Sequence, residues 1–318
     1  MQYTTLGRTG LRVSVAGLGC GGGSRLGMRS GKSEAESVTL VRHAIDLGVS
    51  FLDTAAAYGT ETIVGKAIRE MPRDRVVVAT KAQIRQEGRL RTAQEVIDSL
   101  DNSLRALDTD YVDVFQLHGV PPAAYDHAME QLVPALQGEQ AKGKFRHLGI
   151  TETAPNDPKH LMLQRAVRDD CWDVVMFAFH MMNQNARETV FPLTRENRVG
   201  TLLMFVVRSL FSVPGRVRED MRRLAAERRV PAWLAEREQP LDFLIHDGGA
   251  TSVIDAAYRY GRHEPGADVV LFGTGDVEHL KSNIESILKP PLPAADVARL
   301  NELFGALEGV GLDIPGEQ

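Results

Sequence analysis

The chain has 318 residues, and its 37 Lys and Arg against 42 Asp and Glu give a formal net charge of −5, which argues against electrostatic binding to nucleic acid or an anionic membrane. Hydrophobic residues make up 43% and charged residues 25% of the chain, as in ordinary globular proteins and unlike disordered or fibrous ones. The two cysteines, Cys20 and Cys171, exclude a disulfide framework and a four-thiolate metal site.

Two short β-prone runs, residues 3–6 and 11–14, are the first predicted elements. Thr9-Gly10 lies between them, so together they predict a β-hairpin. From residue 15 onward, short apolar runs alternate with segments of 3.6-residue periodicity. The apolar runs predict eight strands, at residues 15–18, 49–52, 76–79, 111–117, 146–150, 173–179, 200–206 and 268–272.

Helical periodicity is clear before the second strand, at Val38, Val41 and Ile45, and before the fourth, where apolar residues recur over 96–107. The strands are rich in Val, Ile, Leu and Phe without clean alternation, which is typical of parallel strands covered by helices. Eight β–α units in this length favour an α/β protein with a (β/α)8 TIM barrel over two dinucleotide-binding halves. We expect one domain, 1–318, with an irregular loop and helix insertion at 208–265.

Four polar side chains follow predicted strands at the edge where such barrels carry their active sites. Asp53 follows the second strand, Tyr58 comes five residues later, Lys81 follows the third strand and His118 follows the fourth. Singly, each has an ordinary structural explanation, such as a helix cap for Asp53 or packing for Tyr58. Because neighbouring strand ends face one cavity, the four together indicate a proton-transfer site.

The chemistry of these side chains is complementary. A tyrosine hydroxyl, with an ordinary pKa near 10, donates a proton poorly at neutral pH unless a cation stabilises the phenolate. Lys81 would supply that cation, Asp53 would keep Lys81 charged, and His118 would bind the same substrate oxygen. Such a set protonates a carbonyl oxygen, but the sequence offers no obvious nucleophile for the carbon, which indicates a hydride-carrying cofactor.

A first glycine-rich segment, Gly17-x-Gly19-x-x-Gly22, follows the first strand. Loop-like residues continue after it where a dinucleotide-binding fold would begin a helix, so that motif is not expected. Two interpretations remain open: a plain flexible turn, or a rim loop in which Gly19, Cys20 and Gly21 let the cofactor approach the backbone.

A second glycine-rich segment, Gly273-Thr274-Gly275-Asp276, leaves the eighth strand and opens a helix. Backbone N–H groups at a helix N-terminus bind phosphate, and barrels often place a phosphate site after strands seven and eight. The alternative is a helix start capped by Asp276.

Several motifs match one family in order. Asp53-Thr54-Ala55-x-x-Tyr58-Gly59, Lys81 and Gln116-Leu117-His118 resemble the aldo-keto reductase superfamily. The resemblance extends to the hairpin, Gly17-Leu18-Gly19, Arg146-x-Leu148-Gly149-Ile150-Thr151 and Gly273-Thr274-x-x-x-x-His279-Leu280-x-x-Asn283. It spans most of the chain, and only residues 208–265 match poorly.

This resemblance implies a (β/α)8 barrel that binds NADP, or alternatively NAD, without a dinucleotide-binding domain. It implies reversible reduction of a small-molecule aldehyde or ketone, with Tyr58 as general acid and Asp53, Lys81 and His118 completing a tetrad. It further implies cofactor contacts: the nicotinamide ring on Phe179, the carboxamide on Thr151, adenine on Asn283, and the adenosine phosphates beside Thr274 and Gly275.

Other positions depart from the family pattern. Gly273 and His279 stand where NADP-selective members often present Lys and Arg to the 2′-phosphate, and Arg208 is a candidate partner for that group or the pyrophosphate. Glu152 and Met176 stand where many members have Asn and Gln. Glu152 can still accept a hydrogen bond from the carboxamide, whereas Met176 cannot bind it usefully.

Other functions remain as alternatives. The barrel would also suit a non-enzymatic NAD(P)H-binding sensor or regulatory subunit. A Schiff-base aldolase using Lys81 is disfavoured, because an ion-paired lysine is a poor nucleophile, and no motif predicts a metal site. The N-terminus lacks a secretory signal, and no apolar run approaches the roughly 20 residues that span a bilayer, so we expect a cytoplasmic protein.

Overall fold

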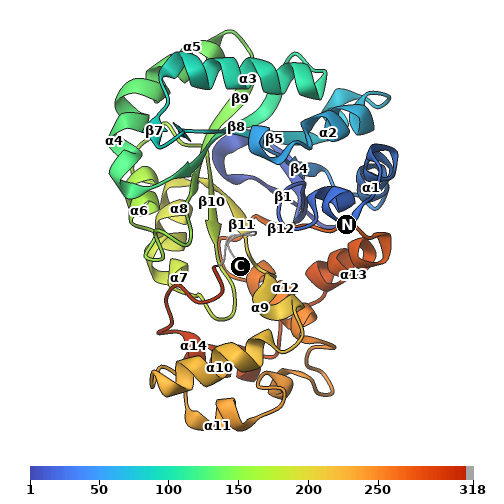
Figure 1. Cartoon of the computed structure of the whole chain (residues 1–318), viewed down its shortest axis with the longest axis vertical. Coiled ribbons are helices and arrows are strands. Elements are labelled where there is room, and N and C mark those ends of the chain that lie inside the picture. The colour runs from blue at the N-terminus through green and yellow to red at the C-terminus, as the bar shows by residue number, and fades with distance from the viewer. Residues whose placement is uncertain (313–318) are drawn as a thin grey trace.

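The computed structural model describes residues 1–312 (Figure 1). At its N-terminus, β1 (Tyr3–Thr5) and β2 (Arg12–Ser14) pair antiparallel, which confirms the predicted hairpin. Gly10 in the turn has φ +73°, a conformation that favours glycine. A second small antiparallel pair, β6 (Arg85–Gln86) and β7 (Arg89–Leu90), lies on the loop that leaves the third barrel strand.

The predicted (β/α)8 barrel is confirmed. Within residues 1–312, eight parallel strands close into one barrel in chain order, the last pairing with the first. They are β3 (Ala16–Gly19), β4 (Phe51–Asp53), β5 (Val77–Gln83), β8 (Val112–Val120), β9 (Phe145–Glu152), β10 (Val174–Ala178), β11 (Gly200–Met204) and β12 (Val269–Phe272). Seven of them lie within three residues of the predicted bounds, β5 ends four residues later than predicted, and β5 and β8 run past Lys81 and His118.

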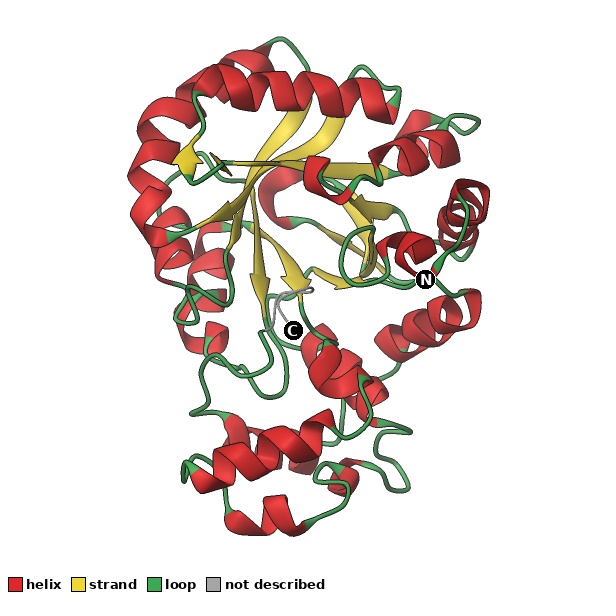
Figure 2. Ribbon diagram, in the orientation of Figure 1, coloured by secondary structure: helices red, strands yellow, loops and turns green. Residues whose placement is uncertain are grey.

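Helices surround the strands on the outside (Figure 2). Those after the successive strands include α1 (Glu34–Asp46), α2 (Glu61–Ile68), α3 (Ala93–Leu107), α4 (Tyr125–His127), α5 (Val133–Ala141), α6 (Leu161–Ala166), α7 (Ala186–Thr189), α8 (Phe191–Asn197), α12 (Val253–Arg262) and α13 (Val277–Leu288). The capping boxes of Ser33 with Glu36 and Thr92 with Glu95 start α1 and α3. In α3 the predicted apolar stripe, Val96 to Leu107, is buried against the barrel.

Alternate residues of the strands point into the barrel. A cluster of buried side chains that includes Phe51, Val77 and Val114 fills the interior, and Leu6 and Val13 of the hairpin join it. The hairpin therefore closes the end of the barrel at which the strands begin. Because side chains alternate along a strand, Asp53, Lys81 and His118 share the inward face of these apolar residues.

Residues 208–265, predicted as an irregular insertion, contain helices outside the barrel pattern followed by one helix that belongs to it. The segment contains α9 (Ser209–Ser212), α10 (Arg216–Ala226), α11 (Ala232–Glu236) and α12. We call residues 208–252 the helical insertion, because α12 has a Ser252 N-cap and packs against β12 and α13 as a barrel helix. In Figure 1, α10 and α11 lie with α14 (Ala294–Phe304) beyond the barrel wall.

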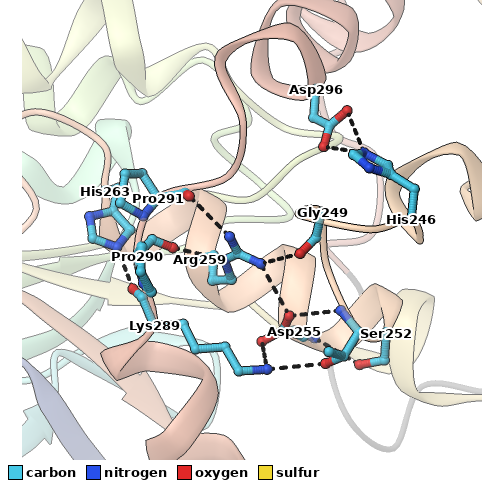
Figure 3. A network of polar contacts seen from close by, with 11 residues as sticks. His246, Gly249, Ser252, Asp255, Arg259, His263, Lys289, Pro290, Pro291 and Asp296 are labelled. Carbon is cyan, nitrogen blue, oxygen red and sulfur yellow. Dashed lines mark hydrogen bonds and ion pairs between the residues drawn. The ribbon is translucent and has the colours of Figure 1, made fainter.

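Arg259 of α12 connects the insertion to the barrel (Figure 3). Its guanidinium donates to the carbonyl oxygens of Gly249 at 2.8 Å, Pro290 at 2.8 Å and Pro291 at 3.0 Å, and lies 3.4 Å from Asp255. The side chain of Arg259 is buried, so its guanidinium depends on these bonds. The insertion, α12 and the linker from α13 to α14 are therefore held together at one side chain.

We expect Arg259→Met to lower the free energy of unfolding by about 3 kcal/mol, because it removes three hydrogen bonds to carbonyl oxygens, each worth about 1 kcal/mol. Urea unfolding followed by circular dichroism measures this change. The control is Arg222→Met on the exposed face of α10, which should change stability by less than about 0.5 kcal/mol. Equal effects of the two substitutions would contradict the role of Arg259.

Candidate active site

The structure brings Asp53, Tyr58, Lys81 and His118 together at the end of the barrel where the strands finish. Asp53 is the last residue of β4, and Lys81 and His118 lie on the inward faces of β5 and β8. Tyr58 ends a single turn of 3-10 helix, Ala56–Tyr58, that follows β4. The spacing in the sequence therefore corresponds to four side chains at one place.

A buried ion pair lies at the centre of this group. Lys81 Nζ is 2.7 Å from Asp53 Oδ1 and 2.8 Å from Oδ2, and it also donates to the Thr54 carbonyl oxygen at 2.8 Å. The Lys81 side chain has no exposed surface. Burial lowers the pKa of Lys81, but the adjacent Asp53 more than offsets this, so Lys81 stays charged. Burial also raises the pKa of Asp53, against the pull of Lys81.

Tyr58 and His118 stand above this ion pair. The Tyr58 hydroxyl lies 3.5 Å from His118 Nε2, and Lys81 Nζ is 5.0 Å from the centre of the tyrosine ring. Burial raises the pKa of Tyr58 by more than Lys81 lowers it, so the phenol is protonated at neutral pH. Burial and the nearby Lys81 charge lower the pKa of His118 to about 3, so its imidazole is neutral.

Buried hydroxyl groups hold the loop that carries Tyr58. The hydroxyls of Thr54 and Thr60 lie 2.9 Å apart across this loop, and Thr80 donates to the Glu61 carboxyl at 2.5 Å. Gly21 lies against the tyrosine ring, because a Cβ there would be 2.5 Å from a ring carbon. The hydroxyl contacts hold the loop, and Gly21 packs against the ring that the loop carries.

A cavity of about 480 Å³ opens beside Tyr58 and Asp53. Part of its wall is backbone without side chains, at Gly19, Gly21 and Gly273, which all come from the two predicted glycine-rich segments. Further lining residues are Met176, Met204, Phe205, Val207, Arg208 and Val213. The cavity thus joins the proton-transfer group to both segments and to the start of the helical insertion.

Cys20 does not line this cavity. Its side chain is completely buried in the core outside the barrel, and its thiol donates to the Leu18 carbonyl oxygen. Its backbone N–H is also used, since it donates to the Asp53 carbonyl oxygen at 2.8 Å. In this structure neither the thiol nor the N–H of Cys20, a predicted cofactor contact, is open to the cavity, and the backbone that lines it in this segment is that of Gly19 and Gly21–Gly23.

Phe179, the residue predicted to stack on the nicotinamide, lies in the core in this structure. Its ring is fully buried, stacks on Tyr260 at 5.8 Å and meets Phe191 edge-on at 5.2 Å. It has no surface toward the cavity. The aromatic residues that line the cavity are Tyr58, Phe272 and Phe205. Phe205 comes directly after β11, with φ +66° and the Arg208 guanidinium 4.0 Å from the centre of its ring. This left-handed turn, which aims Phe205 inward, has no signal in the sequence.

The end of β9 also differs from expectation. The Thr151 hydroxyl accepts a hydrogen bond from the Gly119 N–H at 2.7 Å. The Glu152 side chain points outward from the barrel and is buried. Its carboxylate accepts a hydrogen bond from the Ala178 N–H at 2.9 Å and lies 2.6 Å from His160 Nδ1. Glu152 is therefore unavailable to a carboxamide, while Met176 does line the cavity.

In the second glycine-rich segment, Asp276 is the N-cap of α13. Its carboxylate accepts from the N–H groups of Glu278 at 2.9 Å and His279 at 3.0 Å, so a capped helix start is what the structure contains. Gly275 packs on the loop that follows the first segment, since a Cβ there would lie 2.5 Å from Gly27 Cα.

The other expected contacts of this segment are only partly accessible. The nearly buried Thr274 hydroxyl accepts from the Asp276 N–H at 3.0 Å. His279 is exposed and Asn283 half-buried on α13.

Along residues 1–312 there is no group of three or more His, Cys, Asp or Glu placed to hold a metal ion, and no helix long and apolar enough to cross a bilayer.

Comparisons with known proteins agree on one family. Residues 18–304 match the model of the aldo/keto reductase family. The chain is 31% identical over 294 residues to the aldo-keto reductase YhdN of Bacillus subtilis, covering 86% of this chain and 85% of that protein. It is 32% identical over 208 residues to L-galactose dehydrogenase of Arabidopsis thaliana, covering 64% of each.

Solved structures have the same fold. The holo form of aldo-keto reductase AKR11C1 from Bacillus halodurans superposes with a TM-score of 0.73 at 22% identity, covering 98% of this chain and 100% of that one. An aldo/keto reductase from Klebsiella pneumoniae in complex with NADP and acetate gives a TM-score of 0.67 at 22% identity, covering 96% of both chains.

We expect the His118 ring resonances to stay constant between pH 8 and pH 5 in an NMR titration of the free protein. With its pKa lowered to about 3, His118 remains neutral throughout this range, whereas an unperturbed histidine titrates near 6.5. A His118→Gln variant identifies the resonances. A titration of His118 with a midpoint above pH 5 would contradict the neutral imidazole.

Proposed function

Because this chain belongs to the aldo/keto reductase family, we propose that it uses NADPH to reduce an aldehyde or ketone and that Tyr58 protonates the carbonyl oxygen. One observation carries this proposal: Tyr58 and Asp53 line the cavity, and His118 and Lys81 contact them from behind, His118 at the Tyr58 hydroxyl and Lys81 at the Asp53 carboxylate. Proton donors aimed at a developing oxyanion are what carbonyl reduction requires.

The residues divide the proton transfer between them. The carbonyl oxygen of the substrate accepts hydrogen bonds from the Tyr58 hydroxyl and from His118, which orient the carbonyl group. As negative charge develops on that oxygen, Tyr58 gives up its proton, and the Lys81 ammonium stabilises the phenolate that remains. Asp53 holds Lys81 in its charged form throughout. The nicotinamide cofactor supplies the hydride when bound.

The cavity wall fits a nicotinamide cofactor. Bare backbone at Gly19, Gly21 and Gly273 allows a planar group to lie close to the wall. Phe205, rather than Phe179, offers an aromatic surface within the cavity, and Arg208 beside it supplies positive charge. We assign ring stacking to Phe205 and phosphate binding to Arg208, because both line the same cavity as Tyr58.

The apolar part of the wall favours an apolar carbonyl substrate. Met176, Met204, Val207 and Val213 line the cavity, and such side chains bind hydrocarbon groups without hydrogen-bond specificity. Methionine side chains also adapt to ligands of different shape. We therefore place aromatic and aliphatic aldehydes ahead of highly hydroxylated substrates.

We expect Tyr58→Phe to lower kcat for aldehyde reduction by at least about a hundredfold, because general acid catalysis contributes that much, while the Kd for NADPH stays within about twofold. Absorbance at the NADPH band with an aromatic aldehyde measures turnover, and cofactor fluorescence measures binding.

The matched control is Tyr3→Phe, on the exposed hairpin, which should leave both values unchanged. Near-normal turnover by Tyr58→Phe would overturn the assignment of the acid. NADPH binding by the wild-type protein without reduction of any aldehyde or ketone in a broad panel would contradict carbonyl reduction itself.

We expect Phe205→Ala to raise the Kd for NADPH by about tenfold, because loss of one aromatic stacking contact costs about 1 kcal/mol or slightly more. Phe179→Leu, a change inside the core, should lower thermal stability and leave the Kd nearly unchanged. Fluorescence titration with NADPH tests both variants. The reverse pattern would restore Phe179 as the stacking residue.

A further inference from the structure

Gln116 lies directly below the proton-transfer group without belonging to it. It is on the inward face of β8, two residues before His118, and its register partners are Lys81 on β5 and Gly149 on β9. The side chain has no exposed surface. A glutamine at this depth in the barrel is therefore surrounded by strands and by the buried ion pair.

The amide of Gln116 is directed at Asp53. Gln116 Nε2 donates to Asp53 Oδ1 at 3.5 Å. The same oxygen lies 2.7 Å from Lys81 Nζ, and Oδ2 lies 2.8 Å from it. Both carboxylate oxygens thus face the ammonium group, and the amide contacts the carboxylate from the side of β8.

Gly149 leaves the space that this arrangement needs. A Cβ at residue 149 would lie 2.8 Å from Gln116 Cγ and 3.0 Å from the Val174 carbonyl oxygen. An alanine there would push the glutamine side chain away from β9. The absence of a side chain at Gly149 therefore determines where the amide of Gln116 lies.

The arrangement is unfavourable for packing alone. Among the described residues, Gln116 Oε1 has no hydrogen-bond partner although it is buried. An unpaired amide oxygen destabilises a core, and a leucine of similar volume would avoid this, as the leucines and valines of the barrel interior do. The contact of Nε2 with Asp53 is what a leucine would lose.

We propose that Gln116 is a positioning residue, whose amide holds the Asp53 carboxylate ionised and turned with both oxygens toward Lys81. Gln116 acts through Asp53 on Lys81, and through Lys81 on Tyr58, without touching the substrate. For catalysis this inference rests on the proposed function, whereas the contact with Asp53 can be tested without turnover.

The sign of the effect follows from the charges around Asp53. The charged or titratable groups near it are Lys81 on β5, Tyr58 after β4, His118 on β8 and Cys20 after β3. Burial raises the pKa of Asp53, while Lys81 and Gln116 lower it. Removing the Gln116 amide removes a donor to the charged form, so the Asp53 pKa must rise further.

The test compares Gln116→Leu with the wild-type protein by NMR of aspartate carboxyl carbons labelled with ¹³C, in which Asp53→Asn identifies the Asp53 signal. We expect the Asp53 titration midpoint to move up by about half a pH unit, the size of one weak hydrogen bond. The acid limb of kcat/KM should move with it, giving about threefold slower turnover on that limb.

The matched control is Gln184→Leu, at another buried glutamine, whose amide donates to the carbonyl oxygens of Met181 and Leu300. It should lower the melting temperature and leave the Asp53 midpoint unchanged. If Gln116→Leu does not fold, Gln116→Asn replaces it, because it keeps a buried amide that is one methylene too short to reach Asp53.

An Asp53 midpoint that is the same in the Gln116 variants and the wild-type protein overturns this inference, even if activity falls. Wild-type protein that reduces no carbonyl compound, while Gln116→Leu still shifts the Asp53 midpoint, overturns the proposed function and leaves the role of Gln116 standing.

Discussion

The active end of this barrel depends on burying the Lys81 ammonium group completely. An isolated buried charge is strongly unfavourable, and here both oxygens of Asp53 and the Thr54 carbonyl oxygen surround the ammonium. Asp53 must therefore lie beside Lys81 at the end of β4, and the Lys81 side chain on β5 must point into the barrel. The ion pair sets the positions of Tyr58 above it and of Gln116 below it, and so places an acid, a cation and a neutral imidazole around one point.

The rest of the fold keeps that point rigid and accessible. Leu6 and Val13 of the hairpin close the opposite end of the interior with apolar side chains, so a packed apolar core lies between the ion pair and that end. Gly19 at the end of the first barrel strand and Gly273 directly after the last have no side chains, which leaves room for a flat cofactor close to the backbone. The helical insertion supplies Arg208 and Val213 to the cavity, and Arg259 anchors that insertion to the barrel through backbone carbonyl oxygens.

Strand-end residues were predictable because each follows a recognisable apolar run. Asp53, Lys81 and His118 share one face through the period of two along a strand, and closure of the barrel then brings neighbouring strands together. Phe179 and Phe205 show where this reasoning stops. Both follow apolar strands, and the choice between them depends on a left-handed turn at Phe205 and on the packing of Phe179 against Tyr260 and Phe191. Neither feature has a local pattern.

The sequence by itself determined the alternation of strands and helices, the barrel, the hairpin and the four proton-transfer residues, because these follow from local periodicity and from spacing along single strands. Only the tertiary structure decided which way Glu152 points, that Asp276 caps α13 itself, that Cys20 is buried, and that Gln116 meets Asp53. The cap at Asp276 is a local contact, but the same sequence pattern also fits a phosphate-binding helix start. The other three features depend on contacts between residues far apart in the chain, which local sequence patterns do not record.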